Sequence, residues 1–343
     1  MGVNYQPVLW NRNKKIYDKW IVISILIYLL CFIGITIITN NGTSVETLII
    51  RAFGTLAIAL LHIILAIGPL ARLNSRFLPL LYNRRHLGVS MFLAAMVHGG
   101  FSIFQFHSLG NVNPIYAIFT SNMDYGSLAN FPFQVLGFFA LVILFLMAAT
   151  SHDFWLKNLS PKTWKRLHMM VYPAYGLIIL HVFLGALQQQ PSIGSIAIMS
   201  LGFITIATLH LVTGIKETKA DKIKTQHIKN GWEYVCDIDE IPEDRAKIFI
   251  VDKERIAVFK YDNKLSAISN VCKHQGGPLG EGKVVDGCVT CPWHGYQYLP
   301  HNGQSPPPFT EKITTYRLKN DNNKIYVLPE ALAEGTEVEP IIF

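Results

Sequence analysis

Six apolar segments dominate the first two thirds of this sequence, and each is close to the roughly 20 residues that cross a bilayer as a helix. They occupy residues 20–39, 49–70, 87–107, 132–150, 168–187 and 194–215. Half of the 343 residues are apolar and only 15% are charged, a composition typical of a membrane protein. The pattern therefore predicts an all-α membrane bundle of six helices.

Positive charge gathers in alternate connections between these segments. Basic residues precede the first segment and follow the second, fourth and sixth, whereas the opposite connections carry almost none, with Arg51 the clear exception. Lys and Arg mark the cytoplasmic side, so both termini are predicted to be cytoplasmic. We expect the membrane to be the inner membrane of a bacterium. The first segment lacks a cleavage pattern and should remain as an anchor in the membrane lipid. Orientation also explains the net charge of +7, so nucleic acid is not expected as a partner.

The sequence changes character after the sixth segment. Polar and basic residues suit a linker, and short β-rich runs follow at residues 247–251, 256–260, 314–318 and 324–328. Turn signals, such as Asp262-Asn263 and Asp286-Gly287, separate these runs. The sequence thus divides into a cytoplasmic N-terminus (1–19), a membrane domain (20–215), a linker (216–231), a small all-β domain (232–329) and a loose acidic tail (330–343).

Two short loops of the β domain each offer one thiolate and one imidazole. The first reads Cys272-Lys-His274-Gln-Gly-Gly-Pro, and the second reads Cys291-Pro-Trp-His294-Gly-Tyr. Two cysteines and two histidines are the ligands of a [2Fe–2S] cluster in which both histidines bind one iron. The glycines after the first pair permit the tight backbone that brings amide groups close to sulfur. A zinc site is the alternative, but zinc sites usually pair cysteine with cysteine within one loop.

The other three cysteines are expected to be structural. Cys31 lies in the first apolar segment, and Cys236 is expected in the core of the β domain. Cys288 precedes Cys291 by three residues. We interpret Cys288 as a buried strand residue rather than as a fifth ligand.

Residues 232–329 resemble the Rieske ferredoxin family, including the proline-rich stretch 303–308, which covers the cluster in such domains. The loops differ from those of the Rieske subunit of respiratory bc-type complexes, because they lack the two cysteines that form a disulfide there. Tyr296 also replaces the serine that donates a hydrogen bond to a cluster sulfur. Fewer such bonds disfavour the reduced cluster, so we expect a potential near the low end of the Rieske range, about −150 mV.

Ionisable side chains inside a membrane span are costly and usually functional. His62, His98 and His181 lie well within predicted spans, and His86 and His168 lie at cytoplasmic ends. Histidines at two levels of two helices indicate haem b with two axial histidines. The 13 residues from His168 to His181 do not place both on one helix face, which favours one haem over two.

The membrane histidines do not all suit a haem. His98 and His181 are the best ligand pair. His62 is equally compatible with a histidine that bonds to a neighbouring helix, and His107 and His152, near span ends, are expected to be structural.

Most of residues 45–215 resembles the ferric reductase-like transmembrane family, which includes NADPH oxidases, ferric reductases and the haem-binding subunit of bacterial methionine sulfoxide repair. The matching stretches are Gly68-Pro-Leu70, Asn83-Arg-Arg-His-Leu-Gly88, Ala149-Thr-Ser151 and Trp164-Lys-Arg-Leu-His168. The resemblance implies that His98, His168 and His181 are haem-site residues. His86 falls where some members have no histidine.

These features predict a transmembrane electron conduit. A soluble cytoplasmic reductase or ferredoxin-type donor would reduce the cluster, and haem b would pass electrons to an acceptor at the outer face. Residues 216–343 contain no Gly-rich phosphate loop of a nicotinamide domain, so a separate protein must supply the electrons. One alternative is a Rieske-dependent oxygenase or desaturase, but no mononuclear iron site with two histidines and a carboxylate is evident. Another is a subunit of a quinol-oxidising complex, which the expected low potential disfavours.

Overall fold

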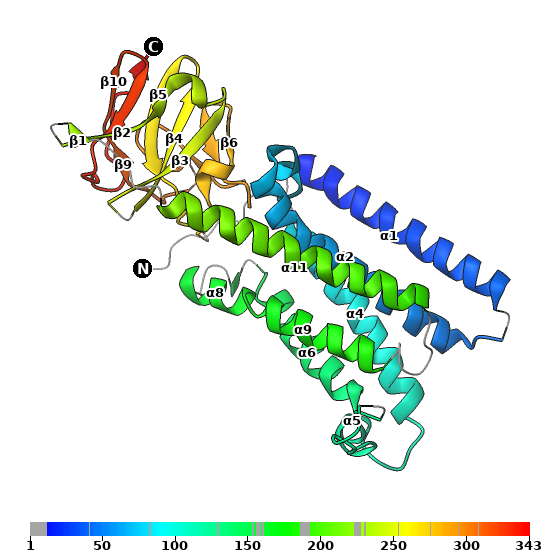
Figure 1. The fold of residues 1–343 in the computed structure, drawn as a ribbon. Coiled ribbons are helices and arrows are strands. Elements are labelled where there is room, and N and C mark those ends of the chain that lie inside the picture. The colour runs from blue at the N-terminus through cyan, green and yellow to red at the C-terminus, as the bar shows by residue number, and fades with distance from the viewer. Residues whose placement is uncertain are drawn as a thin grey trace.

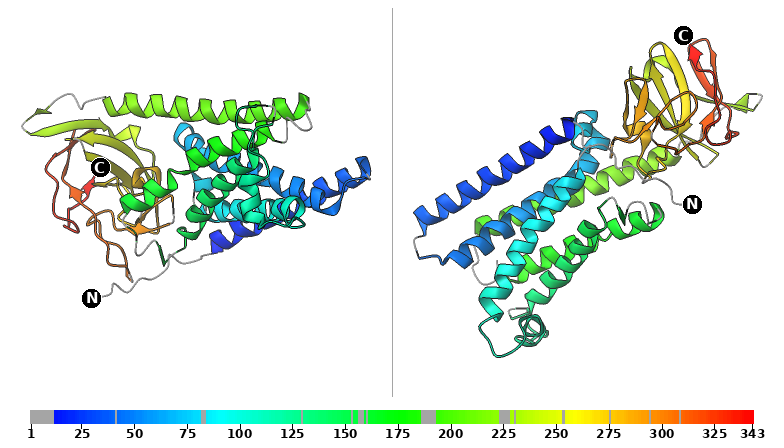
Figure 2. Two further views of the ribbon diagram at one scale, coloured as in Figure 1. Left: turned by 90° about the horizontal axis from the view of Figure 1, so that it is seen from below. Right: turned by 180° about the vertical axis from the view of Figure 1, so that it is seen from behind.

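The computed structural model describes residues 12–343 except 41, 82–83, 129, 153, 156–158, 160, 186–192, 223–227, 230, 253, 275, 294 and 308. The chain forms a helical bundle with a small β domain at one end (Figure 1). The connection between the first two helices and the short helix α5 (Pro114–Thr120) lie at the other end (Figure 2). The predicted order of a helical membrane region and a small all-β domain is therefore confirmed.

The bundle is built from long apolar helices joined by short ones. The long helices are α1 (Arg12–Thr39), α2 (Val45–Leu73), α4 (Arg84–His107), α6 (Phe133–Ala149), α9 (Val171–Leu184) and α11 (Ile193–Lys222). The short helices besides α5 are η1 (Ser75–Phe77), α3 (Leu78–Leu81) and α8 (Pro161–His168).

Five helical segments in the described part of the chain are long and apolar enough to cross a membrane. These segments are residues 14–39, 45–73, 84–107, 163–184 and 193–218. Helix α6 has 17 residues and spans about 25 Å, somewhat less than the roughly 30 Å of a hydrocarbon core. The count of six spans therefore stays a prediction.

The fifth predicted segment contains a break between its two histidines. Helix α8 ends at His168, a turn occupies residues 169–170, and α9 begins at Val171. Pro173 lies in the first turn of α9 and has no N–H to donate to the carbonyl of Met169, which accepts from the N–H of Tyr172 instead (3.2 Å). Because of this break, His168 and His181 lie in two separate helices, α8 and α9.

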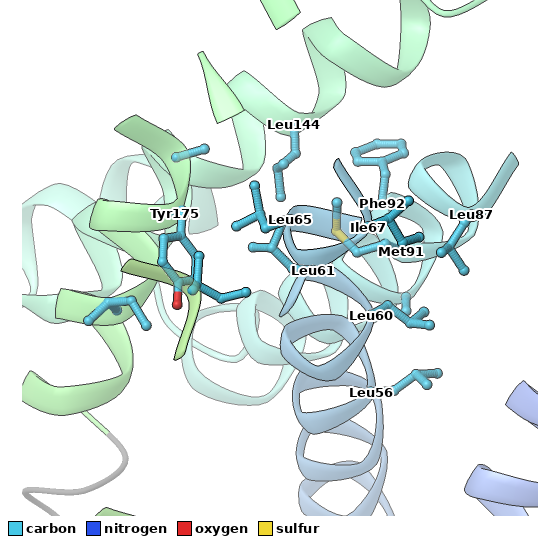
Figure 3. Packing of buried hydrophobic residues seen from close by; sticks show 14 of the residues in the cluster. Leu56, Leu60, Leu61, Leu65, Ile67, Leu87, Met91, Phe92, Leu144 and Tyr175 are labelled. Carbon is cyan, nitrogen blue, oxygen red and sulfur yellow. The ribbon is translucent and has the colours of Figure 1, made fainter. Parts of the chain in front are cut away.

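Helix α2 lies at the centre of the buried apolar core of the bundle (Figure 3). Its Leu61 and Leu65 pack near Leu144 of α6, and Met91 of α4 covers another side (Figure 3). By contrast, apolar side chains on the outside of α1 are exposed, as in Ile38 (82%). An apolar exterior is expected of a bundle surrounded by lipid.

The β domain contains three antiparallel sheets. Their strand orders are β1-β2-β11-β10, β12-β5-β4-β3 with β9 beside β5, and β6-β7-β8. The strands are β1 (Ile228–Lys229), β2 (Trp232–Asp237), β3 (Arg245–Val251), β4 (Glu254–Tyr261), β5 (Lys264–Ser269), β6 (Lys283–Val285), β7 (Cys288–Thr290), β8 (Gln297–Tyr298), β9 (Thr315–Tyr316), β10 (Leu318–Asp321), β11 (Lys324–Val327) and β12 (Ile341–Ile342). Asp262 and Asn263, predicted as a turn, have positive φ angles of 45° and 57°, as a tight hairpin requires.

The C-terminal residues are part of the β domain, so the expectation of a loose tail is wrong. Strand β12 pairs with β5, and the N–H of Val338 donates to the carbonyl of His301 (2.8 Å). The ring of Phe343 lies 5.1 Å from the ammonium of Lys260. The backbone pairing and the aromatic end residue hold the segment despite its acidic composition. At the other boundary, α11 continues through residues 216–222 of the predicted linker.

Candidate metal centres

The two predicted cluster loops share the same pattern of backbone hydrogen bonds among their described residues. In each, the N–H of the cysteine donates to the carbonyl five residues later, and the N–H four residues later donates back to the cysteine carbonyl. Gly276 and Gly295 occupy that fourth position with φ angles of 72° and 73°, a left-handed conformation that favours glycine. Two equivalent loops thus hold Cys272 and Cys291, both of which are buried.

The two loops approach each other at Gly277. The sequence analysis expected the glycines of the first loop only to permit a tight backbone. A Cβ added to Gly277 would lie 2.8 Å from Sγ of Cys291, so only glycine fits beside this sulfur. In the first loop, the ring of His274 stacks on Tyr296 with centroids 5.0 Å apart. The fourth predicted ligand, His294, lies outside the described residues. Two buried sulfurs and an imidazole on facing loops fit an iron–sulfur cluster.

Tyr298 of β8 was missed by the sequence reasoning. Its hydroxyl accepts a hydrogen bond from the N–H of Lys273 (3.0 Å) and lies 3.5 Å from Sγ of Cys272. Burial, followed by the charge of Cys272, raises the pKa of Tyr298 far above its usual range. The hydroxyl therefore stays protonated and can donate a hydrogen bond to the sulfur. Tyr296 instead donates to the carboxylate of Glu311. The only available signal was the inward position of Tyr298 in the strand after the second loop.

Replacing Tyr298 by phenylalanine is expected to lower the cluster potential by about 20–65 mV, because one hydrogen bond of about 0.5–1.5 kcal/mol to sulfur is lost. A redox titration followed by EPR measures this shift. Tyr316→Phe, in the separate core of the β domain, is the control and should leave the potential unchanged. An unchanged potential in Tyr298→Phe would contradict the assignment.

His98 and His181, the predicted haem pair, face each other within the bundle. Their ring centroids lie 6.2 Å apart, and the rings are nearly perpendicular (84°). Two imidazoles that bind one metal ion from opposite sides, with bonds of about 2.0–2.1 Å, have centroids about 6 Å apart. The Nδ1 of each ring lies 2.9 Å from a backbone carbonyl, that of Ile50 for His98 and that of Phe133 for His181. These bonds place the proton on Nδ1 and leave Nε2 available to a metal.

The other two candidate haem residues have different partners. His86 contacts the carboxylate of Asp18 through Nδ1 (2.9 Å). His168 lies 3.0 Å from the carbonyl of Trp164 through Nδ1 and 3.2 Å from the hydroxyl of Ser151 through Nε2. Its ring also stacks on that of Trp164. These partners engage both ring nitrogens of His168, whereas His86 uses only Nδ1.

The remaining predicted histidines also bond to protein groups. His62 contacts the carbonyl of Ile58 (2.7 Å) and the hydroxyl of Tyr175 (3.1 Å), which supports its structural interpretation. His107 contacts the side chain of Gln134 (2.7 Å). The Nδ1 of His152 accepts from the N–H of Phe154 (3.2 Å).

The β domain contacts the end of the bundle through the segment that follows the first cluster loop. Glu281, in the short helix η3 (Leu279–Glu281), lies 3.4 Å from Nε of Arg72 at the end of α2. Lys216 of α11 donates to the carbonyl of Arg72 (3.2 Å), and Arg255 of β4 pairs with Glu217 (3.5 Å). Burial raises the pKa of Glu281, and the charge of Arg72 opposes this shift.

Comparison with known proteins identifies both parts of the chain. Residues 231–317 match the Rieske [2Fe-2S] domain family, and residues 53–179 match the ferric reductase like transmembrane component family. The anthranilate 1,2-dioxygenase ferredoxin subunit of Burkholderia cepacia is 32% identical over 28% of this chain and 90% of its own length. The ferredoxin of carbazole 1,9a-dioxygenase from Nocardioides aromaticivorans IC177 is 23% identical, with a TM-score of 0.28 over 29% of this chain and all of that one.

The membrane part has a relative of its own. The protein-methionine-sulfoxide reductase heme-binding subunit MsrQ of Polaromonas naphthalenivorans is 30% identical over 41% of this chain, which spans 60% of that protein. The Rieske match covers both cysteine loops and favours a [2Fe–2S] cluster over zinc. The chain is an integral membrane electron-transfer protein. It belongs to the Rieske [2Fe–2S] family through its C-terminal domain, which follows a ferric reductase-like transmembrane component.

Proposed function

We propose that this protein carries electrons across a bacterial cytoplasmic membrane, from a soluble cytoplasmic reductase or ferredoxin-type donor to an acceptor at the outer face. The observation that carries the proposal is the position of the two candidate centres in one chain. The Rieske domain contacts one end of the bundle at Arg72, whereas His98 and His181 face each other deeper in the bundle. His98 follows Arg84, at the Rieske end of α4, by 14 residues, or about 21 Å along a helix.

Each part of the chain has a defined task in this proposal. Cys272, His274, Cys291 and His294 would hold the [2Fe–2S] cluster, and His98 and His181 would hold one haem b. When bound, both groups exchange single electrons. Tyr298 directs its proton to the sulfur of Cys272, and the carbonyls of Ile50 and Phe133 fix the protonated nitrogen of each histidine. The partners of His168, which engage both of its ring nitrogens, favour one haem rather than two.

Charge supports the proposed orientation. The Rieske end of the bundle carries a group of basic residues: Arg72, Arg76, Arg84, Arg85 and Lys216. Such residues mark the cytoplasmic side. A donor that meets the Rieske domain would therefore be a cytoplasmic protein.

The proposal is tested with the purified protein in lipid vesicles that enclose ferricyanide. NADH and a ferredoxin reductase are added outside, and ferricyanide reduction is followed optically. We expect a Rieske EPR signal, b-type haem absorbance and ferricyanide reduction well above that of protein-free vesicles. A Rieske signal without haem absorbance, or reduction no faster than in protein-free vesicles, would overturn the proposal.

The contact between the Rieske domain and the bundle should influence electron delivery. Arg72→Glu is expected to slow donor-driven haem reduction about 2- to 10-fold, because an attraction to Glu281 becomes a repulsion at a half-exposed site. Arg72→Glu combined with Glu281→Arg should recover most of the rate, which stopped-flow absorbance measures. Equal rates in the wild type and in Arg72→Glu would show that this contact has no role.

A further inference from the structure

Two helix pairs of the membrane domain hold a histidine in the same way. His98 of α4 donates through Nδ1 to a carbonyl of α2, and His181 of α9 donates through Nδ1 to a carbonyl of α6. Both distances are 2.9 Å. In each pair the histidine follows the carbonyl residue by 48 positions. We call each combination of carbonyl, neighbouring glycine and histidine a histidine seat; the seats are Ile50, Gly54 and His98, and Phe133, Gly137 and His181.

The glycine of each seat lies directly against the imidazole. A Cβ added to Gly54 would be 2.7 Å from Nδ1 of His98, and a Cβ added to Gly137 would be 2.7 Å from Nδ1 of His181. Neither position therefore accepts a side chain while the ring keeps its place. Glycine in a helix interior costs about 0.5–1 kcal/mol relative to alanine, so the helices themselves do not favour it. The space beside the ring is the physical reason for both glycines.

The seats belong to an internal repeat. Counterparts in the two seats are separated by 83 positions: Ile50 and Phe133, Gly54 and Gly137, His98 and His181. Two pairs of buried core residues have the same separation: Leu61 and Leu144, Phe92 and Tyr175 (Figure 3). Helices α2 and α6 run toward the Rieske domain, and α4 and α9 run away from it (Figures 1 and 2). The two pairs are thus related by a rotation about an axis along the bundle, across which the histidines meet.

A third glycine–histidine contact shows what distinguishes a seat. A Cβ added to Gly202 would lie 2.7 Å from Nε2 of His62. However, His62 bonds to the carbonyl of its own helix and to the hydroxyl of Tyr175, so both nitrogens are engaged. In the described part of the chain, Nε2 of His98 and of His181 makes no hydrogen bond. A seat combines a carbonyl from the neighbouring helix, a glycine and an open Nε2.

We propose that Gly54 and Gly137 are positioning residues that set the ring orientation and the protonated nitrogen of His98 and His181. The inference rests on the proposed haem site of this protein. A methyl group at either glycine would displace the imidazole, which can rotate about its side-chain bonds, and would break its bond to the carbonyl. The ring would then present Nε2 in the wrong direction. Because the two seats are equivalent in the repeat, a methyl group at Gly54 and one at Gly137 should have equal effects on haem binding.

The test compares Gly54→Ala and Gly137→Ala with Gly100→Ala and Gly176→Ala. The two control glycines lie on the histidine-bearing helices α4 and α9, and an added Cβ there meets no atom within 4 Å. Haem retention should fall about 10- to 100-fold in each seat variant, as when a supporting partner of a metal ligand is removed. Any remaining haem should shift from a low-spin to a high-spin spectrum. Both controls should match the wild type.

Two further measurements keep the outcomes distinct. The Rieske EPR signal in the same samples reports that each variant is folded. Nitrogen-15 NMR of histidine-labelled protein without haem reports the Nδ1–H form directly, and this form should be lost at one histidine in each seat variant. Unchanged haem content and unchanged NMR signals in both seat variants would contradict the positioning role of Gly54 and Gly137. The proposed function would remain intact. A wild-type protein without haem would overturn the proposed function, and the NMR comparison would still decide the role of the glycines.

Discussion

Replacing His98 by alanine is expected to reduce haem content to less than about a tenth of the wild-type value, and His181→Ala should have the same effect. The two rings face each other at a centroid distance of 6.2 Å, so either substitution would remove one of the two histidines proposed to hold the haem. The Rieske EPR signal should remain, because the cluster loops belong to a separate domain with its own core. Optical spectra of the reduced protein measure haem, and EPR measures the cluster.

His62→Ala is the matched control for these variants. His62 also lies within a membrane helix, but protein groups engage both of its nitrogens. Haem content should therefore stay at the wild-type value. His168→Ala should likewise retain haem, because Trp164 and Ser151 engage both nitrogens of His168. Loss of haem in His62→Ala, or full retention in His98→Ala, would contradict the ligand assignment.

The sequence was sufficient for features that depend on local composition. Apolar segments predicted the helical region, and short β-rich runs with turn signals predicted the β strands around Asp262 and Asn263. The cluster loops were also recognisable, because each places a cysteine and a histidine within a few residues. These signals work because bilayer length, hydrogen bonding and metal chemistry each restrict the residue types at short range.

Features that depend on distant contacts were not predictable in the same way. The carbonyl partner of His98 lies 48 residues away, and the carbonyl belongs to the backbone, so no residue type marks it. Tyr298 was missed because its contact with Cys272 requires the fold of the whole β domain. The C-terminal segment was expected to be loose, since its charge hid the pairing of β12 with β5. The helix break after His168 was not predicted, because the spacing of His168 and His181 showed only that they do not share one helix face.

Replacing Cys272 by serine is expected to abolish the Rieske EPR signal, and Cys291→Ser should do the same. Both sulfurs are buried at equivalent positions of two matching loops, and a serine hydroxyl is a poor substitute for thiolate toward iron. Haem content should be unchanged. Donor-driven haem reduction should fall at least about 10-fold, whereas dithionite should still reduce the haem directly.

Cys288→Ser separates loss of a ligand from loss of a buried thiol. Cys288 lies three residues before Cys291 on β7, where it pairs with Val285, and burial raises the pKa of its thiol. A neutral buried thiol that packs in a strand is replaced by serine at a cost of about 1 kcal/mol in stability, without loss of the cluster. The cluster signal should thus survive in Cys288→Ser and vanish in Cys291→Ser. If the reverse were found, the second loop would hold its metal through Cys288. If donor-driven haem reduction persisted in Cys272→Ser, electrons would enter the membrane domain without passing through the Rieske domain.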